Sequence, residues 1–370
     1  MVSADYNFAY RPLLFGIGLC LCISVQAAQT YGRLVNPQAA SSEWQLPENV
    51  IDTRELPQFS LAANNRPDTP LPVYRLTDNT YFLFGNIATL DEKNRGFNGN
   101  AGFIVTDAGV VVIDTLGTPL LGQRMIASIR SITDKPIKYL IVTHNHPDHA
   151  YGAAAFQAIE GITVIGHPGT REYNNSRNLT ESVDYRRERL PEDMQGFTTL
   201  QPEIFVEKPT FDSLSITLGG QRFDIYNTGR HHSYGDLLVY QPAEEIVWIS
   251  DLAFNQRTTF MGDGNSQQIL KAQAWLLDNF PNARLMVPGH GSPQRKPFPM
   301  VEKTRNYVER LRREMKQAVE NGVSLYDAVQ NSRFEDWQDT RLYEENHRAN
   351  ASFIYREMEK GSVRNSVSFQ

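Results

Sequence analysis

A continuous apolar run, followed at once by a dense cluster of metal-binding side chains, constrains this sequence most. Residues 139–142 read Tyr-Leu-Ile-Val, which is typical of a strand buried on both faces of a sheet. His144, His146, Asp148 and His149 follow directly. Because open α/β sheets place their chemistry at the carboxyl ends of strands, the sequence predicts a functional site at this edge of a sheet.

The residue types in this cluster indicate the chemistry. Imidazole nitrogen and carboxylate oxygen are ligands that suit Zn²⁺. The four side chains lie within six residues, too close together for one tetrahedral ion to use all of them. Solvated loop residues would not explain so many histidines in one turn. The sequence therefore predicts a binuclear site with two zinc ions per chain.

Short β-rich runs and helical segments alternate along most of the chain. Strands are expected at residues 73–76, 81–84, 103–106, 110–114, 139–142, 162–165, 214–218, 222–227, 237–240, 246–250 and 285–287. Helices are expected near residues 118–132, 170–189 and 267–280. This order fits an α/β fold in which helices cover two mixed β-sheets.

The chain is expected to consist of four segments. Residues 1–28 are predicted to be a signal peptide and residues 29–72 a proline-rich N-terminal extension. Residues 73–298 form the main domain, and residues 299–370 form a charged, helical C-terminal extension.

The signal-peptide prediction depends on an apolar run over residues 13–25, followed by the small residues Ala27 and Ala28. The run is shorter than the ~20 residues that a membrane span needs, so an uncleaved anchor is the weaker interpretation. Cys20 and Cys22, the chain's two cysteines, both lie in it, and the mature chain would have neither a disulfide nor a thiolate. We expect a periplasmic or secreted protein.

Composition limits the partners. Lysine and arginine number 36 against 42 aspartates and glutamates, and a formal net charge of −6 offers no broad cationic surface to nucleic acid or anionic lipid. We expect a small-molecule substrate, no nucleic acid partner and no stable membrane insertion after signal cleavage. The sequence leaves the oligomeric state open.

Three later segments extend the histidine cluster into a longer pattern. They are residues 229–236, which read Gly-Arg-His-His-Ser-Tyr-Gly-Asp, the pair Ser250-Asp251, and residues 288–291, which read Pro-Gly-His-Gly. With the H-x-H-x-D-H cluster they resemble the metallo-β-lactamase-fold hydrolases over about residues 73–293. The resemblance implies an αββα sandwich of two mixed β-sheets flanked by helices.

The resemblance also implies roles for seven side chains. The first metal ion would be held by His144, His146 and His232, the second by Asp148, His149 and His290, and Asp251 would bridge the two. His232 is preferred to the neighbouring His231 because consecutive residues point to opposite sides and the spacing to the following Ser and Gly selects His232. His231 is expected behind the site or on the surface.

Metal ions held in this way would lower the pKa of a shared water, and the bridging hydroxide would attack an acyl carbon. Asp148 and Asp251 are the expected catalytic carboxylates, since by the resemblance Asp251 would bridge the metals, and either Asp148 or a metal-bound water would pass a proton to the leaving group. The expected activity is hydrolysis of a small ester, thioester, lactone or β-lactam-like substrate.

Two residues, Asp251 and Phe254, indicate which branches of the family the sequence resembles least. True β-lactamases of this fold have cysteine or serine where this chain has Asp251, and lactonases have tyrosine where it has Phe254. The closest resemblance is to exported quinoprotein-associated and glyoxalase II-like members. A β-lactamase proper is one alternative. A mononuclear iron enzyme of the persulfide-dioxygenase type is another, because it uses the same fold and only His and Asp ligands, which makes iron the alternative metal.

Overall fold

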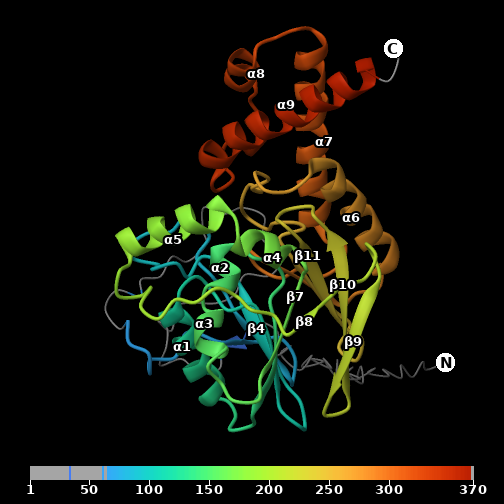
Figure 1. Cartoon of the computed structure of the whole chain (residues 1–370). Coiled ribbons are helices and arrows are strands. Elements are labelled where there is room, and N and C mark those ends of the chain that lie inside the picture. The colour runs from blue at the N-terminus through green and yellow to red at the C-terminus, as the bar shows by residue number, and fades with distance from the viewer. Residues whose placement is uncertain (1–32, 35–60, 62–64, 368–370) are drawn as a thin grey trace, which may run out of the picture.

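A computed structural model describes residues 33–34, 61 and 65–367 of the chain (Figure 1). The predicted signal peptide, residues 1–28, and most of the predicted extension, residues 29–72, lie outside the described residues. Among the described helices, none is both long enough and apolar enough to cross a membrane.

The first sheet contains eight strands in sequence order. They are β1 (Arg33–Leu34), β2 (Tyr74–Arg75), β3 (Thr80–Leu83), β4 (Ala101–Val105), β5 (Val110–Ile113), β6 (Ile137–Ile141), β7 (Thr163–Gly166) and β8 (Ile204–Phe205). The strands from β1 to β5 pair antiparallel, and those from β5 to β8 pair parallel. The sheet is therefore mixed.

The second sheet has five strands in the order β13-β12-β11-β10-β9. They are β9 (Ser213–Leu218), β10 (Gln221–Gly229), β11 (Asp236–Gln241), β12 (Ile246–Ser250) and β13 (Leu285–Pro288). Only the β12–β13 pair is parallel, so this sheet is mixed as well.

Helices cover the outer faces of both sheets, and a separate group of helices follows them (Figure 1). The helices are α1 (Pro119–Arg130), α2 (Pro147–Ala150), α3 (Ala153–Phe156), α4 (Gly169–Asn174), α5 (Arg177–Arg189), α6 (Ser266–Asn279), α7 (Pro299–Glu320), α8 (Leu325–Asn331) and α9 (Tyr343–Val367). Thr118 starts α1 by accepting a hydrogen bond from the backbone N–H of Leu121, and Pro119 fits the first helical position.

The packing of β5 shows how the layers form. Its four residues are all buried, and alternate side chains point to opposite faces. Val110 and Val112 join the core beneath α1, whereas Val111 and Ile113 join the core between the sheets, where they meet Trp248 and other residues of the second sheet. On the far side, α6 packs against β11 and β12. The αββα sandwich predicted from the sequence is confirmed.

The C-terminal helices form a further core, centred on Tyr307 and Leu311 of α7 and Ile354 of α9, to which Met261 and Ile269 of the preceding domain also contribute. Figure 1 shows α7, α8 and α9 standing together beyond one end of the sandwich. This agrees with the expectation of charged, helical residues after Pro299.

Several local details differ from the sequence-based expectations, among them the two-residue strand β1 and the four-residue helices α2 and α3, which the sequence pattern does not predict. A single helix was expected over residues 170–189, but the structure has α4 and α5, because Ser176 caps the start of α5 through the backbone N–H of Leu179. The two-residue strand β8 was not expected, since so short a strand carries no periodic pattern.

Candidate metal centre

The predicted site residues all follow strand ends at one edge of the sandwich. His144, His146, Asp148 and His149 come directly after β6. The other three come from the second sheet: His232 lies in the loop between β10 and β11, Asp251 follows β12, and His290 follows β13. In each sheet the two strands of a parallel pair, β5–β6 in the first and β12–β13 in the second, have their carboxyl ends at the same edge.

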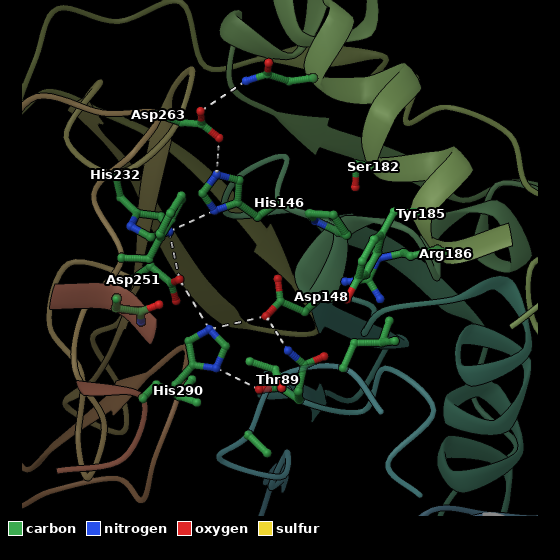
Figure 2. Close-up of a pocket in the computed structure, with 18 of the residues that line it drawn as sticks. Thr89, His146, Asp148, Ser182, Tyr185, Arg186, His232, Asp251, Asp263 and His290 are labelled. Atoms are coloured by element: carbon green, nitrogen blue, oxygen red, sulfur yellow. Dashed lines mark hydrogen bonds and ion pairs between the residues drawn. The ribbon is translucent and has the colours of Figure 1, made fainter. Parts of the chain in front are cut away.

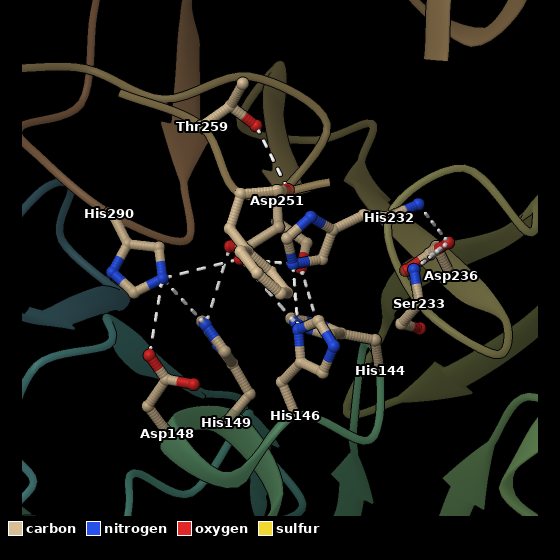
Figure 3. A network of polar contacts seen from close by, with 12 residues as sticks. His144, His146, Asp148, His149, His232, Ser233, Asp236, Asp251, Thr259 and His290 are labelled. Carbon is tan, nitrogen blue, oxygen red and sulfur yellow. Dashed lines mark hydrogen bonds and ion pairs between the residues drawn. The ribbon is translucent and has the colours of Figure 1, made fainter. Parts of the chain in front are cut away.

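The structure brings all seven residues together (Figure 3). They form two groups, each offering ligand atoms within 4.8 Å of one another: His144, His146, His232 and Asp251 in one, and Asp148, His149 and His290 in the other. Asp251 also faces the second group, with Oδ1 at 3.5 Å from Nε2 of His149 and Oδ2 at 3.4 Å from Nε2 of His290. The division matches the one that the resemblance implies, and the side chains' roles as ligands stay a prediction.

The atoms that face the centre of the cluster fit metal ions. Nε2 of His144 and Oδ1 of Asp251 are buried and have no hydrogen-bond partner among the described residues. Nδ1 of His146 and Nε2 of His232 face each other at 2.8 Å. Two imidazole nitrogens at this distance satisfy one another only if one of them carries a proton, whereas a cation accepts both lone pairs.

Polar groups behind the cluster orient three of its histidines: His149 and His290, described here, and His146, described next. Asp114, at the end of β5, lies with Oδ2 at 3.0 Å from Nδ1 of His149. The carbonyl oxygen of Asn98 lies 2.7 Å from Nδ1 of His290. A carboxylate or carbonyl oxygen can only accept, so both Nδ1 atoms carry protons and both Nε2 lone pairs face the centre.

Asp263 orients His146 in the opposite sense. Its Oδ2 lies 3.1 Å from Nε2 of His146, which leaves Nδ1 of the ring to face the cluster (Figure 2). Oδ1 of Asp263 accepts a hydrogen bond from Nδ2 of Asn178 at 3.1 Å. Asp263 lies in an irregular loop with no motif around it, so the sequence pattern does not predict its role. Asp114 could have been found, since it follows a buried strand directly.

The charge states of two cluster members, Asp251 and His144, suit cation binding. Burial opposes ionisation of Asp251, but His290, His149 and His232 around it hold the pKa of its carboxyl well below the usual range. Burial holds the pKa of His144 well below its usual value. A carboxylate and a neutral imidazole are the forms that bind a metal ion. Burial opposes protonation of His149, but Asp251 and Asp114 raise its pKa to about 9, so a metal ion would have to displace a proton from this ring.

The remaining histidines near the site, His231 and His167, contact neighbouring loop and strand residues and do not face the cluster. His231 is buried rather than on the surface, and its Nε2 lies 3.1 Å from Oγ1 of Thr228. Asp236 accepts the backbone N–H groups of His231, His232 and Ser233 at 2.8, 2.9 and 3.2 Å, which fixes the loop that presents His232. Nε2 of His167 contacts Oδ1 of Asn227 at 3.1 Å.

A cavity of about 430 Å³ opens over the cluster (Figure 2). Five cluster residues line its floor: His146, Asp148, His232, Asp251 and His290. Tyr173 and Tyr185 line its walls, whereas the nearby Met194 and Phe197 pack into the core of the first sheet.

The C-terminal extension also reaches the cavity, through Leu342 and Asn346. Nδ2 of Asn346 donates to the carbonyl of Thr258 at 2.9 Å, and the backbone N–H of Thr258 donates to the carbonyl of Arg341 at 2.8 Å. The start of α9 is thereby joined to the loop after β12, which supplies Arg257, Phe260 and Asp263 to the cavity wall.

Comparison with known proteins agrees with this geometry. Residues 94–301 match the family model of the metallo-beta-lactamase superfamily. The metallo-beta-lactamase type 2 of Bacteroides fragilis is 26% identical over 200 residues, which cover 51% of this chain and 70% of that protein. A linear primary-alkylsulfatase of a Pseudomonas species is 39% identical over 54 residues, 15% of this chain and 10% of that one.

A solved structure of the sec-alkylsulfatase Pisa1 from Pseudomonas has the same fold, with a TM-score of 0.61 and 18% identity over 77% of this chain and 50% of that one. A double mutant of the same enzyme matches with a TM-score of 0.63 and 16% identity over 90% of this chain and 60% of that one. A match of 90% reaches into the C-terminal helices, because the residues before Pro299 number 298 of 370. The chain therefore belongs to the metallo-β-lactamase superfamily, whose relatives named here are hydrolases.

Proposed function

We propose that this chain is an exported, zinc-dependent metallohydrolase that cleaves a small acyl-type substrate such as an ester, thioester, lactone or β-lactam-like compound. The observation that carries the proposal is the cluster on the cavity floor, where buried Nε2 of His144 and Oδ1 of Asp251 lack partners among the described residues. Such atoms are costly to bury unless a cation pairs with them.

The two carboxylates of the cluster have different proposed roles, one as a metal ligand and one in proton transfer. Zinc ions held there would supply a water molecule acidic enough to act as nucleophile near neutral pH. Asp251 is buried, with 3% of its side chain exposed, and serves as a ligand between the two groups. Asp148 has 15% of its side chain exposed and lines the cavity. Burial opposes its ionisation, but His149 and His290 hold the pKa of its carboxyl well below the usual range, so it would have to take a proton from the nucleophilic water before passing one to a leaving group. Nδ2 of Asn98 donates to Asp148 at 3.2 Å and fixes its direction.

The names of the relatives widen the set of substrates to test. One relative is a metallo-β-lactamase and two are alkylsulfatases, so sulfate esters join the acyl compounds. A β-lactamase proper is the less favoured alternative, because Asp251 gives the second metal a carboxylate ligand that would make it a poorer electrophile. An iron-dependent persulfide dioxygenase could use a subset of the same ligands, and metal analysis separates it from a hydrolase.

The proposal is tested by a substrate panel on the zinc-loaded mature chain, with an ester, a thioester, a lactone, a sulfate ester and nitrocefin. We expect hydrolysis of at least one non-lactam substrate, loss of that activity with a chelator, and recovery with zinc. Turnover of nitrocefin alone, with kcat/KM in the ordinary enzymatic range of about 10⁴–10⁸ M⁻¹s⁻¹, would return the chain to the β-lactamases.

A further inference from the structure

Two arginines line the cavity in a buried state without a carboxylate partner. Arg186 comes from α5 and is 6% exposed, and Arg257 comes from the loop after β12 and is 9% exposed. Within the described part of the chain, no carboxylate oxygen forms an ion pair with either guanidinium within 4.0 Å. Nη1 of Arg186 and Nε of Arg257 are buried and have no hydrogen-bond partner there.

The one close polar contact of Arg257 does not satisfy it. Its Nη1 lies 2.9 Å from Nδ1 of His290. That Nδ1 carries a proton, because the carbonyl oxygen of Asn98 lies 2.7 Å away and can only accept. A protonated ring nitrogen cannot accept from a guanidinium, so Arg257, which lines the cavity, keeps donors without an acceptor among the described residues.

The acidic residues of the cavity are all engaged elsewhere. Asp148 and Asp251 belong to the candidate metal cluster. Glu181 forms an ion pair with Arg177 at 2.5 Å, and Asp263 contacts His146 and Asn178. Once cations occupy the cluster, the two arginines make the cavity attractive to an anion.

The energetic cost of burying a guanidinium group also favours a bound anion in the cavity. Burial lowers the pKa of Arg186, and the neighbouring Asp148 offsets only part of this effect. A buried cation without a close counterion is costly, and a bound anion would remove that cost.

We propose that Arg186 and Arg257 form a recognition site for an oxyanion group, so that the substrate is a negatively charged ester. A guanidinium presents a planar fork of N–H donors that matches carboxylate, sulfate and phosphate oxygens. The uncharged part of the substrate would lie against the apolar wall that Phe260 and Leu342 provide. The site extends the proposed hydrolase function, since the bound ester is the one cleaved at the cluster.

The first test is equilibrium binding of inorganic sulfate and inorganic phosphate to the zinc-loaded mature chain, measured by calorimetry. Arg186→Met and Arg257→Met are each expected to raise the Kd of the anion that binds wild type at least tenfold, equivalent to about 1.4 kcal/mol. The matched control is Arg187→Met, which removes the same charge from an exposed position of the same helix and is expected to change Kd less than twofold. Zinc content and melting temperature are measured for every variant.

The second test compares the p-nitrophenyl esters of sulfate, phosphate and succinate, which are anionic, with neutral p-nitrophenyl acetate. The arginine variants should lower kcat/KM at least tenfold for the anionic ester that wild type prefers, and less than twofold for the acetate. The three anionic esters show which oxyanion the site takes. Arg186→Lys and Arg257→Lys keep the charge but lose the fork, so intermediate losses are expected, and these variants replace any methionine variant that does not fold.

Three results would overturn the inference. They are unchanged anion binding in the arginine variants, equal losses on neutral and anionic esters, or a wild-type preference for the acetate. If the zinc-loaded chain hydrolyses the acetate but binds no anion, the hydrolase proposal stands and the anion site fails. If it hydrolyses no substrate yet binds sulfate through the two arginines, the hydrolase proposal fails and the anion site stands.

Discussion

At the residue scale, three histidines of the cluster, His146, His149 and His290, depend for their orientation on the groups behind them. Asp263 is the most informative of these groups, because it alone holds a histidine with Nδ1 rather than Nε2 toward the centre. Carboxylates that orient metal-binding histidines are typically worth 10–100-fold in metal affinity.

We predict that Asp263→Ala weakens zinc binding by roughly 10–100-fold, because His146 loses the acceptor that fixes its ring. The measurement is a competition titration against a chelator. The exposed Asp278, changed to alanine, serves as the control and should bind zinc as wild type does. Equal zinc affinity in the Asp263 variant would show that His146 is oriented by other contacts.

The adjacent pair His231 and His232 provides a second residue-scale prediction. His232 faces the cluster, with Nε2 at 2.9 Å from Oδ2 of Asp251, whereas His231 contacts Thr228 in the loop. His232→Ala should therefore lose at least one zinc ion per chain, and His231→Ala should retain both, as read by elemental analysis after dialysis. Loss of zinc from the His231 variant alone would exchange the two roles.

The seven candidate ligands could be predicted from the sequence because each sits in a short motif with fixed spacing. Arg186, Arg257 and Asp263 could not, since each lies in a helix or irregular loop whose local sequence gives no sign of which side faces the cavity. Their importance arises only from the way separate segments meet in the fold.

At the element scale, the strands with continuous or alternating apolar residues were the easiest to predict. The expected strand at residues 246–250 matches β12, because all five of its residues are buried between sheet and helix. The C-terminal helices were expected only as a group, since charged helical residues do not show which faces pack together. Their core forms through contacts such as Tyr307 with His347, 40 residues apart.

His347 gives these helices a predicted pH response. Burial, with help from nearby arginines, lowers its pKa to about 4, against 6.5 for the free side chain. Between pH 6.5 and 4 the unfolded chain therefore binds more protons, so the free energy of unfolding falls as the pH drops through this window. At pH 5 the expected loss is about 2 kcal/mol relative to pH 7.

The measurement is denaturant unfolding at pH 7 and pH 5 for wild type and for His347→Gln. Because other histidines also titrate, the informative quantity is the difference between the two proteins. Wild type should lose more stability than the variant on acidification, by about 2 kcal/mol. The same loss in both would mean that His347 does not titrate in this window.

At the scale of the whole molecule, the sandwich supplies the cluster and the C-terminal helices complete the cavity wall. The two mixed sheets flanked by helices and the site edge followed from the sequence pattern and the family resemblance, whereas the order of the strands did not. The contact between α9 and the loop after β12, made by Asn346 and Thr258, did not, because it joins segments about 90 residues apart.

We further predict export of the chain, from the apolar run over residues 13–25 and the small residues after it. N-terminal sequencing of the periplasmic fraction should find a mature chain that begins at Ala28 or Gln29. An intact Met1 on protein recovered from the cytoplasm would refute export.

The most direct test of the whole proposal is the metal content of the purified mature chain, measured together with oxygen uptake during turnover. A binuclear hydrolase predicts two zinc ions per chain and turnover without oxygen consumption. One tightly bound iron ion per chain, with turnover that consumes oxygen, would contradict the hydrolase proposal and assign the chain to the dioxygenases.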